Sequence, residues 1–209
     1  MTIRRSIDDY GIKNRMQTLF DNPPASAIHH SRARLRAWFA QTAPMIEWDQ
    51  MVSPLGELFV GVTQRGLCAV DFGHGKSEFL ERFDAHARLA RNPRAVAQAT
   101  AQLREYFSGA RKHFTLAVDL SSLTPFQRRV LDAARLITPG TVWTYHHLAQ
   151  AIGRPQSSRP VGQALGRNPI PIVIPCHRVI ASDGSLGGYS GGSGLKAKRW
   201  LLELEGALS

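Results

Sequence analysis

The 209-residue chain has 43% hydrophobic and 20% charged residues, which suits a folded protein with one large or two small domains. Its formal net charge is +10, and residues 1–40 carry seven basic against three acidic residues, residues 41–120 nine of each, and residues 121–209 ten against four. Such a localised excess indicates either a polyanionic partner or a solvated basic face. No stretch approaches the ~20 apolar residues of a membrane span, and no apolar segment follows the N-terminal arginines, so we expect a cytoplasmic protein without a membrane partner.

The character of the sequence changes twice along the chain. Residues 1–44 lack a regular pattern, apart from an arginine-rich stretch that predicts a short helix at Arg32–Gln41, and we interpret them as a basic N-terminal extension. Residues 45–120 combine strand-forming runs with helical patterns and predict an α/β domain. Residues 121–209 predict a second domain built from short helices.

A β-hairpin is the clearest signal in the α/β part. The runs Glu57–Thr63 and Leu67–Phe72 are rich in strand-forming residues and flank a turn around Gln64–Gly66. The other elements expected here are a helix over 78–90 capped by Ser77, a helix over 94–107 opened by Pro93 and ended by Gly109, and a strand over 114–120.

The C-terminal part predicts a series of capped helices. A Ser or Thr side chain before a helix can accept a hydrogen bond from a free N–H of the first turn. This rule predicts helices over 125–136 after Thr124, over 145–152 between Thr144 and Gly153, and from Ser158 through Gly166. The last two are joined by a tight turn, which fits a helix-turn-helix or a plain helical hairpin.

The segment Asn168–Ile180 carries the strongest chemical signal. Cys176 follows three prolines and precedes His177 and Arg178, and imidazole and guanidinium groups stabilise a thiolate. Neighbouring residues in a strand point to opposite faces, so His177 can reach Cys176 only where the chain bends. Cys68 lies in a strand-forming run and fits a buried structural cysteine. Because nothing else indicates secretion, we expect two free thiols rather than a disulfide.

We expect no metal and no cofactor. The pairs His29-His30 and His146-His147 lack the spacing that places two ligands on one helix face, and the sequence has no Cys-x-x-Cys pair. Gly191–Lys196 is rich in glycine but lacks the Gly-Lys-Ser/Thr ending of a phosphate loop, so we interpret it as a turn-rich loop.

The motif Pro175-Cys-His-Arg-Val-Ile180 resembles the active-site motif of the O6-alkylguanine-DNA alkyltransferases, also called methylated-DNA–protein-cysteine methyltransferases. The resemblance is dense over 124–206, weaker over 51–120 and absent from 1–44. Further motifs in the family's order support it, namely Ser53-Pro-Leu-Gly56, Ser158-Arg-Pro-Val-Gly162, Arg167-Asn-Pro169, Gly188-Tyr-Ser-Gly-Gly192 and Trp200-Leu-Leu-Glu-Leu-Glu-Gly206. The resemblance implies an α/β fold plus an α part: a small ribonuclease-H-like domain and then a winged helix-turn-helix domain. It also implies a monomer that acts on double-stranded DNA containing O6-alkylguanine.

By this resemblance, Cys176 accepts the alkyl group from O6 of guanine, or from O4 of thymine, and the protein acts once. His177 would generate the thiolate through a water, and Glu205, with Glu203 as the nearby alternative, would orient His177. Tyr145 would donate a proton to the departing guanine and contact the DNA, and Asn168 would form a hinge. Pro171, Val179, Tyr189 and Ser190 would line the guanine pocket. Ser158 and Arg159 would contact the DNA.

The implied chemistry is physically coherent. A thiolate is a suitable nucleophile for an ether-like O6-methyl group, and the lesion must be flipped out of the duplex, at a cost of a few kcal/mol. Arg159 would fill the vacated space or make an ordinary phosphate contact. Two other classes remain open: a DNA-binding regulator in which Cys176 is only a sensor, and a cysteine hydrolase that turns over many times.

Overall fold

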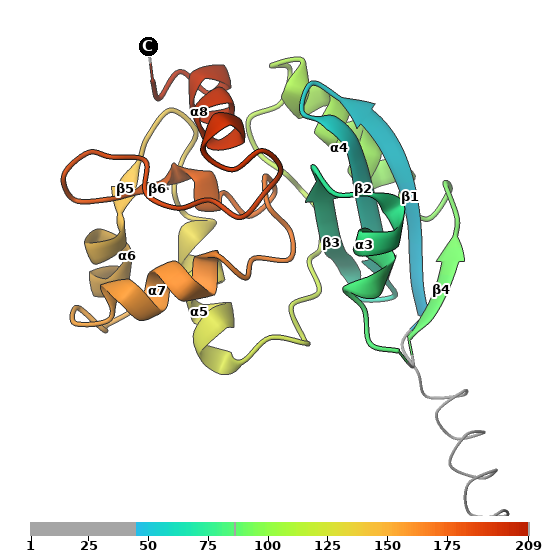
Figure 1. Ribbon diagram of the computed structural model, residues 1–209, viewed down its shortest axis with the longest axis horizontal. Helices are drawn as coiled ribbons and strands as arrows, with labels where there is room; N and C mark the ends of the chain where they lie inside the picture. The colour runs from blue at the N-terminus through green and yellow to red at the C-terminus, as the bar shows by residue number, and fades with distance from the viewer. Residues whose placement is uncertain (1–44, 86, 209) are drawn as a thin grey trace, which may run out of the picture. The chain divides into compact units, whose positions relative to one another are not determined.

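The computed structural model describes residues 45–85 and 87–208 (Figure 1). The helix expected at Arg32–Gln41 lies outside these residues. The first described half contains a four-stranded sheet with the order β3-β2-β1-β4, formed by β1 (Met45–Ser53), β2 (Gly56–Thr63), β3 (Gly66–Phe72) and β4 (Arg88–Arg91). Strands β1, β2 and β3 are antiparallel neighbours, and β4 is parallel to β1.

The expected hairpin is confirmed in β2 and β3, which pair from Thr63↔Gly66 to Leu58↔Phe72. Gly66 has a φ of 135° and an added Cβ would lie 2.4 Å from the carbonyl oxygen of Ala117, so the turn requires a glycine. Strand β1 was not among the expected elements, although it pairs with β2 from Glu47↔Val62 to Ser53↔Gly56.

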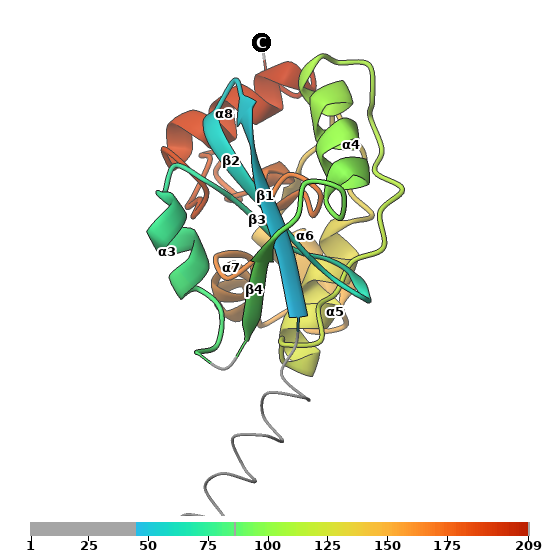
Figure 2. The ribbon, with the colours of Figure 1, turned by 90° about the vertical axis from the view of Figure 1, so that its right-hand side faces the viewer.

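Two helices cover the sheet on opposite sides (Figure 2). Helix α3 (Lys76–Glu81) packs Phe79 against Phe59, with ring centroids 5.2 Å apart, in a cluster that also contains Trp48. Helix α4 (Ala97–Phe107) buries Leu103 and Tyr106 in the main core. Because alternate residues of a strand face opposite ways, β2 supplies Phe59 to one cluster and its neighbours to the other.

Three expectations for this half are wrong in extent or type. The helix expected over 78–90 covers only Lys76–Glu81, with Gly75 rather than Ser77 as its N-cap, and Arg88–Arg91 forms β4 instead. The second helix begins at Ala97, three residues later than expected, but ends at Phe107 as expected. Residues 114–120 form only an isolated bridge, Leu67↔Val118, rather than a strand.

The second half contains α5 (Pro125–Ala134), α6 (Tyr145–Ala151), α7 (Ser158–Leu165) and α8 (Leu195–Leu204), with a short parallel pair, β5 (Trp143–Thr144) and β6 (Val179–Ile180). Thr124 and Thr144 cap α5 and α6 as expected, by accepting hydrogen bonds from the N–H groups of Gln127 and His147. The N-cap of α7 is Ser157 rather than Ser158, and its side chain makes no capping hydrogen bond.

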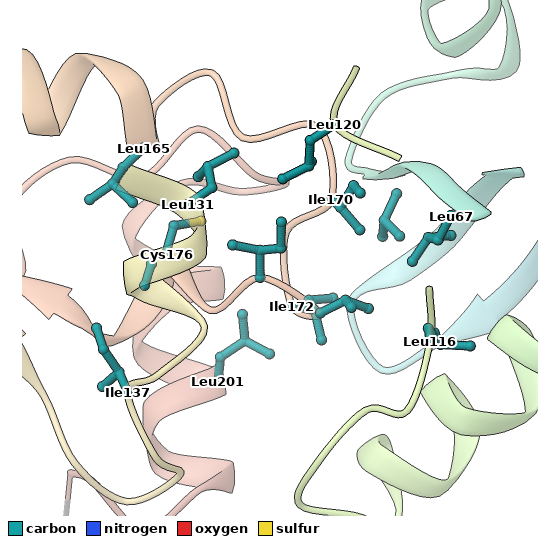
Figure 3. Close-up of a cluster of buried hydrophobic side chains, with 14 of the residues drawn as sticks. Leu67, Leu116, Leu120, Leu131, Ile137, Leu165, Ile170, Ile172, Cys176 and Leu201 are labelled. Carbon is teal, nitrogen blue, oxygen red and sulfur yellow. The ribbon is translucent and has the colours of Figure 1, made fainter. Parts of the chain in front are cut away.

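The two halves share one apolar core beside strand β3 (Figure 3). Leu67, Leu116 and Leu120 of the first half lie near Ile170 and Ile172 of the second, in the cluster that also includes Leu131, Leu201 and Cys176. The backbone N–H of Val70 donates to the carbonyl of Pro169 at 2.9 Å. None of the described helices is both long and apolar enough to cross a membrane.

Candidate active site

The reactive segment leaves α7 and passes through the core before it reaches Cys176. Asn168, which is buried, fixes this path: its Nδ2 donates to the carbonyl of Ile174 at 2.8 Å, and its Oδ1 accepts from the N–H of Ile170 at 3.0 Å. Ile172 has a φ of 75°, an unusual value for a β-branched residue. The chain then turns at Pro175 into a short 3-10 helix, Cys176–Arg178, which supplies the bend that a strand would have lacked.

Cys176 is a buried thiol. It is 6% exposed, and its Sγ accepts a hydrogen bond from Asn168 Nδ2 at 3.2 Å. Burial raises the pKa of Cys176 above its ordinary value, although the Asn168 hydrogen bond and the positive charge of Lys198 act in the opposite direction. The resting thiol is therefore neutral and needs a base to become a nucleophile. Cys68 is also a free cysteine, half-buried in β3.

His177 and Glu205 form a buried pair. His177 Nε2 lies 3.0 Å from Glu205 Oε1, and their side chains are 0% and 3% exposed. Burial lowers the pKa of His177, against the opposing effect of Glu205. A carboxylate only accepts, so Nε2 carries the ring proton and Nδ1 is left as an acceptor. His177 Nδ1 is buried and has no hydrogen-bond partner. Glu203, the alternative carboxylate, is exposed.

Arg178 holds the other side of Glu205. Its Nε donates to Oε2 at 2.8 Å and its Nη2 to Oε1 at 2.7 Å, while Nη1 donates to the carbonyl of Ile137. Tyr106 of α4 also donates to Oε1, at 2.7 Å. Burial alone would raise the pKa of Glu205, but the hydrogen bonds from His177 and Arg178 lower it to about 2. Arg178 therefore contacts the carboxylate of Glu205 rather than the thiol of Cys176. The contact from Tyr106 was not predicted from the sequence.

Lys198 of α8 is the second residue that the sequence analysis missed. Its side chain is completely buried, and its Nζ donates to the carbonyls of Val179 and Leu186, each at 2.5 Å. Burial lowers the pKa of Lys198 to about 8. The signal was present, because residue 198 lies three and four positions before Leu201 and Leu202 on the buried stripe of α8.

Cys176 lines a cavity of about 660 Å³. Tyr145, Tyr189 and Ser190 line it, together with Ser158 and Arg159 of α7. Five of the expected site residues therefore surround one space with Cys176. The hydroxyl of Tyr145 donates to the carbonyl of Gly188 at 3.4 Å, and that of Tyr189 is buried without a partner.

Two expected pocket residues lie elsewhere. Pro171 is buried and lines a smaller neighbouring cavity of about 320 Å³, which also contains Asn168. Val179 is buried in β6, does not line the larger cavity, and its carbonyl accepts a hydrogen bond from Lys198. Across 45–85 and 87–208, no three His, Cys, Asp or Glu side chains are grouped so that they could hold a metal ion.

The fold and the site together define a two-domain protein in which a buried cysteine and a histidine–carboxylate pair lie beside a helix-turn-helix. Residues 46–120 match the ribonuclease-like domain of 6-O-methylguanine DNA methyltransferase, and residues 125–207 match the DNA-binding domain of the same proteins. The chain belongs to the 6-O-methylguanine DNA methyltransferase family. The expected family and fold class are thereby confirmed.

Individual relatives agree with this assignment. The methylated-DNA–protein-cysteine methyltransferase of Methanosarcina barkeri is 41% identical over 158 residues, which cover 76% of this chain and 96% of that protein. The protein of the same name from Shigella flexneri is 38% identical over 168 residues, with coverage of 77% and 95%. The crystal structure of Mycobacterium tuberculosis OGT in complex with DNA superimposes with a TM-score of 0.68 at 36% identity and covers 77% of this chain and 93% of its own.

Proposed function

We propose that this protein repairs alkylated DNA by transferring a methyl group, or a related alkyl group, from O6 of guanine in a duplex to its own Cys176. O4 of thymine is a second acceptable donor. The observation that carries the proposal is the single cavity that Cys176 shares with the face of α7 and with Tyr145. Proteins of this architecture bind DNA at the helix-turn-helix. An alkylated base that leaves the bound DNA can therefore reach the thiol of Cys176 through this cavity.

The thiolate is generated when substrate is bound. Because burial favours the neutral forms of both Cys176 and His177, the resting site holds a thiol beside a neutral imidazole. The unpartnered Nδ1 of His177 is an acceptor that a bridging water can satisfy, and that water relays the thiol proton to the ring. Glu205 stabilises the resulting imidazolium, as the carboxylate does in other Cys–His–acid sites.

The transfer step forms one bond and breaks one. The sulfur of Cys176 bonds to the methyl carbon, and the bond between that carbon and O6 breaks, with its electron pair moving into the guanine ring. Tyr145 lines the cavity, and burial raises its pKa, so its hydroxyl remains a proton donor for the departing base. Tyr145 then regains a proton from solvent, and the imidazolium of His177 releases one to solvent. Tyr189 and Ser190 hold the flipped guanine, since the buried Tyr189 hydroxyl lacks a protein partner. Asn168 fixes the segment that presents the thiol.

The lesion reaches the cavity by base flipping. Arg159 is exposed on α7 at the rim of the cavity, where its side chain can fill the space that the flipped nucleotide leaves. Ser158 and Tyr145 contact the adjacent DNA backbone. The excess of ten basic over four acidic residues in 121–209 supplies the attraction for phosphate. We expect the protein to work as a monomer in the cytoplasm.

None of the described residues around Cys176 can reverse the formation of a stable thioether, so each molecule acts once. The test is to mix the protein with a molar excess of a duplex that holds one O6-methylguanine. The wild type should repair one equivalent and then stop, Cys68→Ala should behave identically, and Cys176→Ala should bind the duplex without repairing it. Repeated turnover would instead support a cysteine hydrolase, and binding without repair by the wild type would support a sensor.

A further inference from the structure

Among the described residues, Tyr106 supplies Glu205 with a side-chain hydrogen bond from the ribonuclease-like half of the protein. It lies in α4, is 2% exposed, and donates its hydroxyl proton to Glu205 Oε1 at 2.7 Å across 99 positions of sequence. The ring is fixed by Phe107 and Phe114, whose centroids lie 5.6 and 5.3 Å away. The hydroxyl therefore reaches the active site from a rigid position that does not depend on the reactive segment.

The same carboxylate oxygen serves three donors. Glu205 Oε1 accepts from Tyr106 Oη at 2.7 Å, from Arg178 Nη2 at 2.7 Å and from His177 Nε2 at 3.0 Å. Charged acceptors distribute their negative charge among the donors that they bind, so the hydrogen bonds of Tyr106 and Arg178 limit the charge that His177 experiences. The bond to His177 is the longest of the three.

We propose that Tyr106 is a positioning residue for alkyl transfer, which orients Glu205 and tempers its charge so that His177 stays a neutral base with its proton on Nε2. This inference rests on the proposed function and assigns the ribonuclease-like half a direct part in it. The transferred proton still passes from Cys176 to His177, and Tyr106 neither gains nor loses one.

The surroundings of Glu205 and His177 support this role. The charged or titratable groups that face the pair are Tyr106 from α4, Arg178 from the 3-10 helix, Lys198 from α8, and Cys176 and Tyr189 at the cavity. Burial and the negative charge of Glu205 raise the pKa of Tyr106 well above its ordinary value. Tyr106 therefore remains a neutral donor between about pH 5 and about pH 9, while Arg178 supplies the compensating charge.

The test compares Tyr106→Phe with a matched packing variant, Phe114→Leu, in the full-length protein. Phe at position 106 keeps the ring and removes only the hydroxyl, whereas Phe114→Leu loosens the same aromatic cluster and leaves the hydrogen bond in place. Single-turnover transfer from duplex O6-methylguanine is measured from about pH 5 to about pH 9, where imidazole and thiol groups titrate.

Tyr106→Phe should slow transfer near neutral pH by about threefold to tenfold, because Glu205 and His177 are held less precisely without the Tyr106 hydrogen bond. It should also move the acid limb of the profile upward by about half a unit, because a more negative Glu205 favours imidazolium in the resting protein. Phe114→Leu should keep the wild-type profile. Equal profiles for Tyr106→Phe and the wild type, or the same upward movement in Phe114→Leu, would overturn the inference.

A direct readout separates this inference from the proposed function. The pKa of His177, followed by NMR of its ring protons in the DNA-free protein, should rise in Tyr106→Phe and stay unchanged in Phe114→Leu. If the wild type transfers no methyl group, the proposed function fails, and the NMR titration still decides whether Tyr106 controls His177. An unchanged His177 pKa in Tyr106→Phe would contradict the role of Tyr106 even if repair is normal.

Discussion

Replacing the buried Arg178 by methionine should lower the free energy of unfolding more than replacing any exposed arginine in the protein. The guanidinium makes two hydrogen bonds to the buried Glu205 carboxylate and one to the carbonyl of Ile137. The native site lowers the pKa of Glu205 from its ordinary value of 4.5 to about 2. At about 1.4 kcal/mol for each unit, the whole shift corresponds to about 3 kcal/mol, and the hydrogen bonds of His177 as well as those of Arg178 produce it. Removing Arg178 takes away its part of this shift and also leaves the buried Glu205 without its cationic partner, a loss that typically costs about 3–5 kcal/mol.

The pH dependence identifies the cause of the loss. Since the folded-state pKa of Glu205 is depressed, its contribution is complete above about pH 4.5 and disappears as the pH falls toward about 2. Urea unfolding of Arg178→Met should therefore show a deficit of about 3 kcal/mol near neutral pH that shrinks in acid. The control Arg129→Met, at an exposed position of α5, should stay within about 0.5 kcal/mol of the wild type. A deficit below about 1 kcal/mol, or one independent of pH, would refute this reasoning.

Three further outcomes are expected. Arg159→Ala should slow repair of duplex lesions far more than reaction with free O6-benzylguanine, since only the duplex must be held open; equal slowing would place Arg159 in the environment of Cys176. Affinity for undamaged duplex, measured by fluorescence anisotropy, should fall at least about tenfold between about 50 and 200 mM salt, because phosphate contacts release counterions. An affinity that does not depend on salt would show that the excess basic residues do not contact the DNA. A protein that begins at Met45, the first residue of β1, should keep its unfolding free energy within about 1 kcal/mol and its repair rate near normal; an unfolded or inactive product would show that the extension supports the core.

Local chemistry explains which elements could be predicted. The helices after Thr124 and Thr144 begin where expected because an N-cap hydrogen bond depends only on residues three positions apart. Strand β4, in contrast, exists because Arg88–Arg91 pairs with β1, more than 40 residues earlier. Its residues, together with Leu80 and Phe83, also fit a helical spacing, so the sequence predicted a helix that was too long. Pairing between distant segments is not visible in local periodicity.

The active site shows the same difference between residues marked by the local sequence and contacts between distant segments. The motif around Cys176 and His177 predicted a reactive segment that lines the cavity, and the motif Trp200–Gly206 predicted Glu205 as the partner of His177. The partners of Glu205 could not be found in the same way, because Tyr106 reaches it from another domain and nothing in its local sequence marks a polar contact. Lys198 lies between the exposed Lys196 and Arg199, so its residue type did not distinguish it from its exposed basic neighbours, although its spacing from Leu201 did.

The most direct test of methyl transfer to Cys176 is to locate the methyl group after repair. The wild-type protein is mixed with an equimolar duplex that carries a single O6-methylguanine, digested, and analysed by peptide mass spectrometry. One methyl group should appear on the peptide that contains Cys176, none on the peptide that contains Cys68, and the DNA should contain unmodified guanine. A repaired duplex with an unmodified Cys176, or a methyl group on any other residue, would contradict transfer to Cys176.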